Sequence, residues 1–149
     1  MIDRDRNGKP CLSGCHERAF SLSNSGDLAV VAVAQDGAAG LCIGIDVERD
    51  EMPREADVMV AGFFSRAERM AWAALDPSER RQAFVRLWTR KEAVAKSAGG
   101  IKALPFTQLT ADPDGQYAMA ELPDHRSWRL ASWRPTAGYL ATLAIMESG

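Results

Sequence analysis

In the stretch Leu41-Cys42-Ile43-Gly44-Ile45-Asp46-Val47-Glu48, large apolar residues alternate with glycine or acidic residues from Ile43 onward. This alternation predicts a β-strand over 41–48. One face of this strand would carry Ile43, Ile45 and Val47, and the other Gly44, Asp46 and Glu48. Residues two apart on a strand project to the same side about 6.6 Å apart, so the two carboxylates can hold one hard cation. A solvated polar strand face explains the same alternation, and spacing alone leaves both alternatives open.

Helices are predicted after this strand, with the pattern turning helical around Met59. Ser65-Arg66-Ala67-Glu68 is a capping box that opens one helix. Asp76-Pro77, with Glu79 three residues after the cap, opens a longer helix that we expect to run to Gly99-Gly100. At 100° per residue its apolar stripe comprises Phe84, Leu87, Trp88, Ala95 and Ala98.

Three charged residues lie in or beside that stripe. Lys91 falls inside it, Glu92 lies at its edge, and Lys96 lies one turn beyond Glu92. A buried charge is costly unless it is paired, so these side chains must form ion pairs, bind a metal or reach solvent. A Glu92–Lys96 surface pair is the simplest alternative. If the helix instead packs on strand 41–48, Glu92 supplies a third carboxylate to a magnesium site with Asp46 and Glu48.

The other elements are predicted to be hairpins. Gly26-Asp27 joins a strand over 19–24 to an apolar strand over 28–34, which we expect to be buried. Turn residues separate the later expected strands, which cover 106–109, 117–122, 128–133 and 139–146. The prediction is a single α+β domain over residues 1–149, with antiparallel strands and hairpins packed on a long helix.

The composition excludes several classes of protein. The 149 residues are 46% hydrophobic and 26% charged with a net charge of -2, a length that can bury a core without disulfide or metal staples. The acidic balance disfavours a nucleic-acid binder. The longest apolar run is far too short to cross a membrane, and the polar start is no signal peptide. With three cysteines, Cys11, Cys15 and Cys42, best explained as reduced thiols, we expect a cytoplasmic protein.

Five short motifs occur in a recognisable order. They are Gly8-Lys9-Pro10, the segment 20–26, the segment 44–48, Phe63-Phe64-Ser65 with Glu68, and the segment 88–93 followed by Lys96 and Gly99. Their order and gaps resemble those of the 4'-phosphopantetheinyl transferases, of the type that activates nonribosomal peptide and polyketide synthases. The resemblance implies a fold like the C-terminal half of these enzymes. It also implies transfer of the phosphopantetheine arm of coenzyme A to a serine of an apo acyl or peptidyl carrier protein, with release of adenosine 3',5'-bisphosphate.

The resemblance further implies roles for individual residues. Asp46, Glu48 and Glu92 would hold a magnesium ion that offsets charge on the leaving group. Glu92 would also take the serine proton, and Lys96 would neutralise the pyrophosphate, so that Asp46, Glu92 and Lys96 form the catalytic set. Lys91 is expected to orient Glu92 or to pack its stem.

A second group of residues would bind coenzyme A. Lys9 and Ser23 match positions that contact its 3'-phosphate, and Asn24 stands where the family has a histidine. Asparagine can donate a hydrogen bond to phosphate but carries no charge, which weakens that contact. The arginines of the long helix form either a solvated face or a surface for an acidic carrier protein. They are Arg80, Arg81, Arg86 and Arg90.

The chain departs from the family in length. Members of this type have two similar halves with the site between them, whereas this chain begins near the end of the first half. The smaller holo-acyl-carrier-protein synthases resemble one half and place their sites between subunits. We therefore expect exposed apolar surface and a homo-oligomer. Two alternatives stay open, a shortened non-catalytic relative that binds coenzyme A or a partner protein, and an incomplete form of a longer enzyme.

Overall fold

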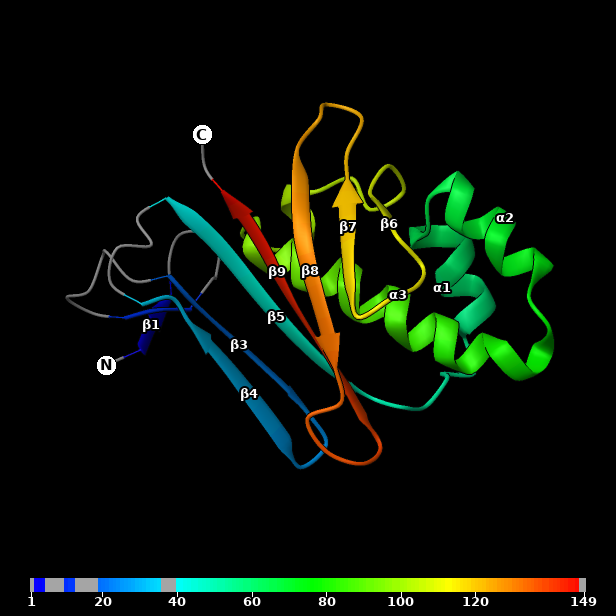
Figure 1. Ribbon diagram of the computed structural model, residues 1–149, viewed down its shortest axis with the longest axis horizontal. Helices are drawn as coiled ribbons and strands as arrows, with labels where there is room; N and C mark the ends of the chain where they lie inside the picture. The colour runs from blue at the N-terminus through cyan, green and yellow to red at the C-terminus, as the bar shows by residue number, and fades with distance from the viewer. Residues whose placement is uncertain (1, 5–9, 13–18, 36–39, 148–149) are drawn as a thin grey trace.

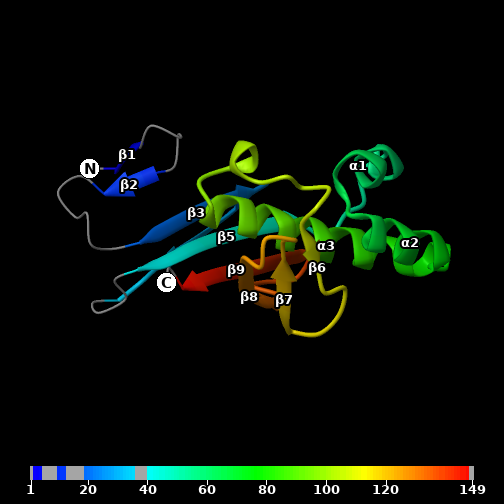
Figure 2. The same ribbon diagram turned by 90° about the horizontal axis from the view of Figure 1, so that it is seen from above.

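The centre of the fold is an antiparallel sheet of five strands in the order β5-β9-β8-β7-β6. The computed structural model describes residues 2–4, 10–12, 19–35 and 40–147. The strands are β5 (Leu41–Arg49), β6 (Thr110–Ala111), β7 (Tyr117–Glu121), β8 (Ser127–Trp133) and β9 (Tyr139–Glu147). Helix α3 (Pro77–Ser97) lies across one face of this sheet (Figure 1; Figure 2). The α+β architecture with antiparallel strands on a long helix is confirmed.

Capping residues define the helices as the sequence predicted. The short helix α1 (Ala56–Phe63) precedes α2 (Arg66–Ala74), whose Ser65 hydroxyl accepts from the Glu68 amide while the Glu68 carboxylate accepts from the Ser65 amide. Helix α3 ends at Ser97, slightly before the expected glycines. Gly99 and Gly100 have φ angles of 100° and 121°, which only glycine adopts without strain. A 3-10 turn, η1 (Ile101–Ala103), follows.

Two hairpins precede the sheet. β1 (Ile2–Arg4) pairs with β2 (Pro10–Leu12), and β3 (Phe20–Ser25) pairs with β4 (Leu28–Val33). β3 lies alongside β5, the edge strand of the sheet (Figure 1). Among the described residues no helix is both long and apolar enough to span a bilayer.

The prediction that segment 28–34 is buried was wrong. Among the described strands β4 pairs only with β3, and every second residue of β4 is exposed. Val31 is 58% exposed and Val33 is 56% exposed. An apolar run of this length indicates a strand but does not distinguish a buried strand from an edge strand.

The predicted strand over 106–109 was also wrong, because this segment is a turn. The amides of Gln108 and Leu109 donate to the Pro105 carbonyl at 2.8 and 3.1 Å. Phe106 and Leu109 are both buried, and a spacing of three residues suits one side of a turn rather than one face of a strand. The strand β6 begins only at Thr110.

The expectation of a solvated arginine face fails at Arg90, which is fully buried. Its guanidinium donates to the carbonyls of Asp112, Asp114 and Gly115 and to the Ser132 hydroxyl. Burial lowers the pKa of Arg90 to about 10. The residue thus fastens the loop between β6 and β7 to α3 and does not face a partner.

Candidate functional site

The site forms where β5 passes directly under α3. At Gly44 a Cβ atom would lie 2.0 Å from the Ala93 carbonyl oxygen and 2.4 Å from the Ser97 amide nitrogen. Only a glycine allows the helix backbone to come this close to the strand. The contact sets Glu92 and Lys96 of α3 against Asp46 and Glu48 of β5.

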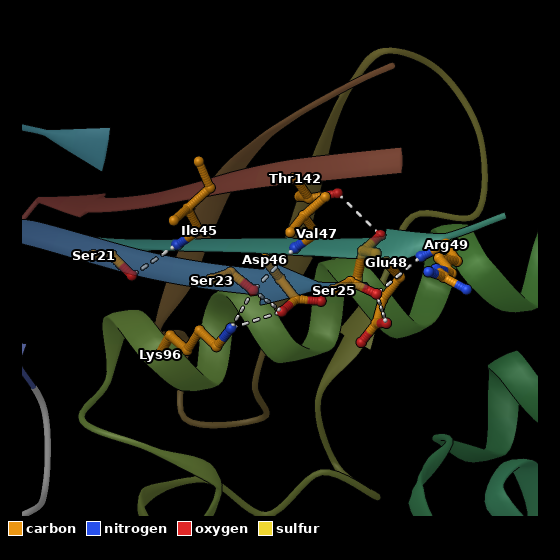
Figure 3. A network of polar contacts seen from close by, with 11 residues as sticks. Ser21, Ser23, Ser25, Ile45, Asp46, Val47, Glu48, Arg49, Lys96 and Thr142 are labelled. Atoms are coloured by element: carbon orange, nitrogen blue, oxygen red, sulfur yellow. Dashed lines mark hydrogen bonds and ion pairs between the residues drawn. The ribbon is translucent and has the colours of Figure 1, made fainter. Parts of the chain in front are cut away.

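Asp46 is the most buried acid of the site, at 3% exposed. Its Oδ1 lies 2.7 Å from Lys96 Nζ and accepts a hydrogen bond of 3.0 Å from the Ser23 hydroxyl (Figure 3). Burial raises the pKa of Asp46, and the Lys96 ammonium opposes the rise. The predicted alternative of a Glu92–Lys96 surface pair is wrong, because Lys96 forms its ion pair with Asp46.

Glu48 and Glu92 share an electrostatic environment with Asp46. Burial raises the pKa of Glu48, and the neighbouring charge of Asp46 raises it further. Burial raises the pKa of Glu92 to about 7, with contributions from Asp46 and Glu48 that Lys96 partly offsets. These couplings mean that the three carboxylates lie close enough to repel one another and that one ammonium compensates them.

The surroundings of Asp46 bear on the predicted metal site. Asp46 Oδ2 is buried and has no hydrogen-bond partner among the described residues. A buried unpaired carboxylate oxygen beside two further carboxylates fits a hard divalent cation. Within the described part of the chain, however, no three His, Cys, Asp or Glu side chains are already arranged as a metal site. The Asp46, Glu48 and Glu92 ligand set stays a prediction.

Of the residues predicted to bind coenzyme A, Ser23 and Lys96 are in contact. The Ser23 hydroxyl faces the site, where it accepts from Lys96 Nζ at 2.8 Å and from the Val47 amide at 3.2 Å. With its donation to Asp46, these contacts use its whole hydrogen-bonding capacity. Asn24, the next residue on β3, is exposed on the opposite face. Lys9 lies outside the described residues.

Lys91 does not orient Glu92, which corrects that part of the prediction. Its Nζ lies 2.7 Å from Glu68 Oε2 and donates to the Leu109 carbonyl, and the side chain is fully buried. The other Glu68 oxygen accepts from the Ala111 amide at 2.9 Å. Successive helical residues point 100° apart, so Lys91 faces α2 and β6 while Glu92 faces β5. The pair joins α2, α3 and β6.

An apolar pocket of about 300 Å³ opens beside Glu48. Its apolar lining comes from the loop after β5 and from helices α1 and α3, and includes Met52, Met59, Phe84 and Trp88. Trp88 and Phe84 stack with their ring centroids 6.1 Å apart. The site thus combines a charged floor with an adjoining apolar recess.

Sequence reasoning missed two residues that contact β5, Ser21 and Ser25. The Ser21 hydroxyl accepts from the Ile45 amide at 3.0 Å, and Ser25 accepts from the Arg49 amide at 3.3 Å. The signal was present as serines at alternate positions of one strand, but nothing in the sequence says which strand lies opposite them.

Comparison with known sequences identifies similar proteins. Residues 42–144 match the sequence model of the 4'-phosphopantetheinyl transferase superfamily. The chain is 35% identical over 130 residues to the 4'-phosphopantetheinyl transferase psf-1 of Bacillus pumilus, covering 85% of this chain and 52% of that protein. It is 32% identical over 122 residues to the transferase Sfp of Bacillus subtilis, covering 80% and 51%. The chain therefore spans about half the length of these relatives.

Comparison with solved structures shows a similar fold. The crystal structure of Thermotoga maritima holo-[acyl-carrier-protein] synthase matches with a TM-score of 0.56 at 17% identity. The match covers 72% of this chain and 63% of that one.

Proposed function

Because the chain belongs to the 4'-phosphopantetheinyl transferase superfamily, we propose that it transfers the phosphopantetheine arm of coenzyme A to a carrier protein. The acceptor would be a serine of an apo acyl or peptidyl carrier protein, and the second product adenosine 3',5'-bisphosphate. The observation that carries the proposal is the meeting of Asp46 and Glu48 on β5 with Glu92 and Lys96 on α3 at the Gly44 contact.

The acids would serve two purposes. Asp46, Glu48 and Glu92 would hold Mg²⁺, which supplies a positive charge for the pyrophosphate oxygens. Glu92 would take the serine proton, directly or through water. The serine oxygen forms a bond to phosphorus, and the pyrophosphate oxygen leaves with its electron pair on adenosine 3',5'-bisphosphate.

Lys96 and β3 would receive the phosphates. The Lys96 ammonium would pair with the pyrophosphate, and Lys9, Ser23 and Asn24 would lie near the 3'-phosphate. Since the single hydrogen of the Ser23 hydroxyl is donated to Asp46 and phosphate oxygens only accept, Ser23 becomes available to phosphate only after it releases Asp46. The uncharged pantetheine chain would run along the apolar recess beside Glu48.

The setting of the enzyme is also part of the proposal. We infer a cytoplasmic protein of secondary metabolism that binds neither nucleic acid nor membrane. We further propose that it self-associates through the outer face of the β3–β4 hairpin, where Leu22 is 38% exposed next to Val31 and Val33.

A second candidate is a non-catalytic relative that binds coenzyme A or a partner protein. It is favoured by the Lys96–Asp46 ion pair, which leaves Asp46 already matched with a cation, and by the uncharged Asn24.

Intact-mass spectrometry of carrier proteins tests the two candidates. Apo acyl and peptidyl carrier proteins are incubated with the chain, coenzyme A and Mg²⁺, with Asp46→Ala as the inactive control and the exposed Asp27→Ala as its match. A mass gain of one phosphopantetheine arm, lost only in Asp46→Ala, establishes the transferase. Absence of any gain together with retained coenzyme A binding by calorimetry establishes the binding protein instead.

A further inference from the structure

Strand β3 presents serines at every second position to the edge of β5 that faces away from β9. The hydroxyls of Ser21, Ser23 and Ser25 accept from the amides of Ile45, Val47 and Arg49 at 3.0, 3.2 and 3.3 Å (Figure 3). Each step of two residues along β3 matches a step of two along β5, so the strands run parallel. Side-chain hydroxyls thus take the place of a backbone ladder at this edge.

Two of these serines make a second contact. Ser23 donates to Asp46 Oδ1 at 3.0 Å, and Ser25 donates to Glu48 Oε2 at 3.4 Å. A serine hydroxyl that accepts from a backbone amide keeps its own hydrogen for an acceptor. Ser21 lies opposite Gly44, which has no side chain, and therefore no carboxylate is available there.

Glu48 needs such a partner more than Asp46 does. Asp46 is short, buried and paired with Lys96, whereas Glu48 is longer, lies near the end of β5 and is only half-buried. Repulsion from Asp46 favours rotamers that turn the Glu48 carboxylate away from the site. A hydroxyl fixed by the Arg49 amide opposes that movement.

We propose that Ser25 is a positioning residue that aims the Glu48 carboxylate at the site shared with Asp46 and Glu92. The inference rests on the proposed function, in which Glu48 is a metal ligand. Partners that orient a metal ligand commonly contribute 10- to 100-fold to metal affinity. Because the Ser25 contact is long, we expect about the lower limit of that range.

The test measures Mn²⁺ binding to the full chain without coenzyme A, by calorimetry and by the electron paramagnetic resonance signal of free Mn²⁺. Ser25→Ala should weaken binding about tenfold, and Ser25→Thr, which keeps the hydroxyl, should restore it. Ser21→Ala is the matched control, because it removes one bond between β3 and β5 without touching a carboxylate. It should bind Mn²⁺ like the wild type, and thermal unfolding should show that both alanine variants fold.

The possible results distinguish failure of the Ser25 role from failure of the proposed metal site itself. If the wild-type chain binds Mn²⁺, and Ser25→Ala binds it as tightly as Ser21→Ala does, the proposed role of Ser25 is overturned and the metal site is retained. Failure of the wild-type chain to bind Mn²⁺ overturns the metal site and, with it, this inference. Binding that falls in Ser25→Ala and stays low in Ser25→Thr also overturns it, since the hydroxyl would then not be the cause.

Discussion

The ammonium of Lys96 lies 2.7 Å from Asp46 Oδ1, so α3 already supplies a cation to the buried acid of β5. The same oxygen accepts from Ser23, which leaves the other Asp46 oxygen as the unpaired one. A divalent ion that uses Asp46 must therefore share it with Lys96 or displace it. If the ion displaces Lys96, the ammonium becomes free to pair with phosphate.

Replacing Lys96 should change metal binding and activity in opposite directions. In Lys96→Met the competing ammonium is lost, and Mn²⁺ should bind about tenfold tighter in the absence of coenzyme A, which corresponds to about 1.4 kcal/mol. Transfer activity should fall because the pyrophosphate loses its charged partner. Calorimetry and the carrier-protein assay measure the two effects, with the exposed Lys102→Met as control. Weaker Mn²⁺ binding in Lys96→Met would show that the two cations do not compete.

The close contact at Gly44 predicts that alanine at this glycine is far more destabilising than alanine at Gly62. Gly44→Ala places a methyl group against the α3 backbone and should destabilise the protein by about 3 kcal/mol, at the upper end for overpacking. Gly62→Ala, in helix α1 with nothing within 4 Å of the new Cβ, should be neutral or stabilise by up to about 1 kcal/mol. Urea denaturation gives both values. Equal stability of the two variants would contradict the close approach of β5 and α3.

Lys91 should matter for stability rather than chemistry. Lys91→Met leaves the buried Glu68 carboxylate without its charge partner and should cost about 3–5 kcal/mol. The double variant Glu68→Gln/Lys91→Met should lose less than the sum of the single losses, because neither charge is then stranded. Urea denaturation of all four proteins completes the cycle. Strict additivity would rule out the coupling.

Glu92 should make the metal-free protein less stable as the pH rises. The pKa of Glu92 in the folded chain, about 7, lies above its ordinary value of 4.5, so between these values the folded chain binds more protons than the unfolded chain. Its stabilising contribution is complete below pH 4.5 and is lost as the pH rises through 7. Glu92→Gln carries no charge at any pH.

Melting curves in excess chelator test this dependence. Near about pH 8, Glu92→Gln should be more stable than the wild type by about 1–2 kcal/mol, after discounting for solvent screening of a half-buried group. Near about pH 4 the two should coincide. The exposed Glu121→Gln is the control. A difference between Glu92→Gln and wild type that does not vary with pH would refute the raised pKa.

The outer face of the β3–β4 hairpin should control association. Val31→Glu places a charge in the exposed apolar patch and should shift the protein towards monomer by light scattering, with the exposed Glu121→Gln again as control. The unfolding free energy should change by less than about 0.5 kcal/mol, as for other surface substitutions. A wild-type protein that is monomeric at working concentrations would contradict self-association.

The sequence was informative where one periodicity or one cap settles the structure. The alternation at 41–48 and the caps at Ser65 and Asp76 predicted β5, α2 and α3, and with them the acids of the site. The partners of side chains were not predictable in the same way. A helical wheel placed Lys91 inside the apolar stripe, but only the fold brings Glu68 to it. Likewise Arg90 was assigned to solvent because its acceptors are carbonyls of a distant loop, which leave no mark in the sequence.

The two edges of β5 differ in what holds them, and this has a consequence for motion. Towards β9 the strand is joined by a continuous antiparallel backbone ladder, which persists whatever side chains are present. Towards β3 the hydrogen bonds described above pass through the side-chain hydroxyls of Ser21, Ser23 and Ser25, and a hydroxyl can rotate whereas a backbone amide is fixed in its strand. The β3–β4 hairpin can therefore open from the sheet as a local event while β5 keeps its place. The boundary of that opening runs through Ser23 and Ser25, directly beside the acids.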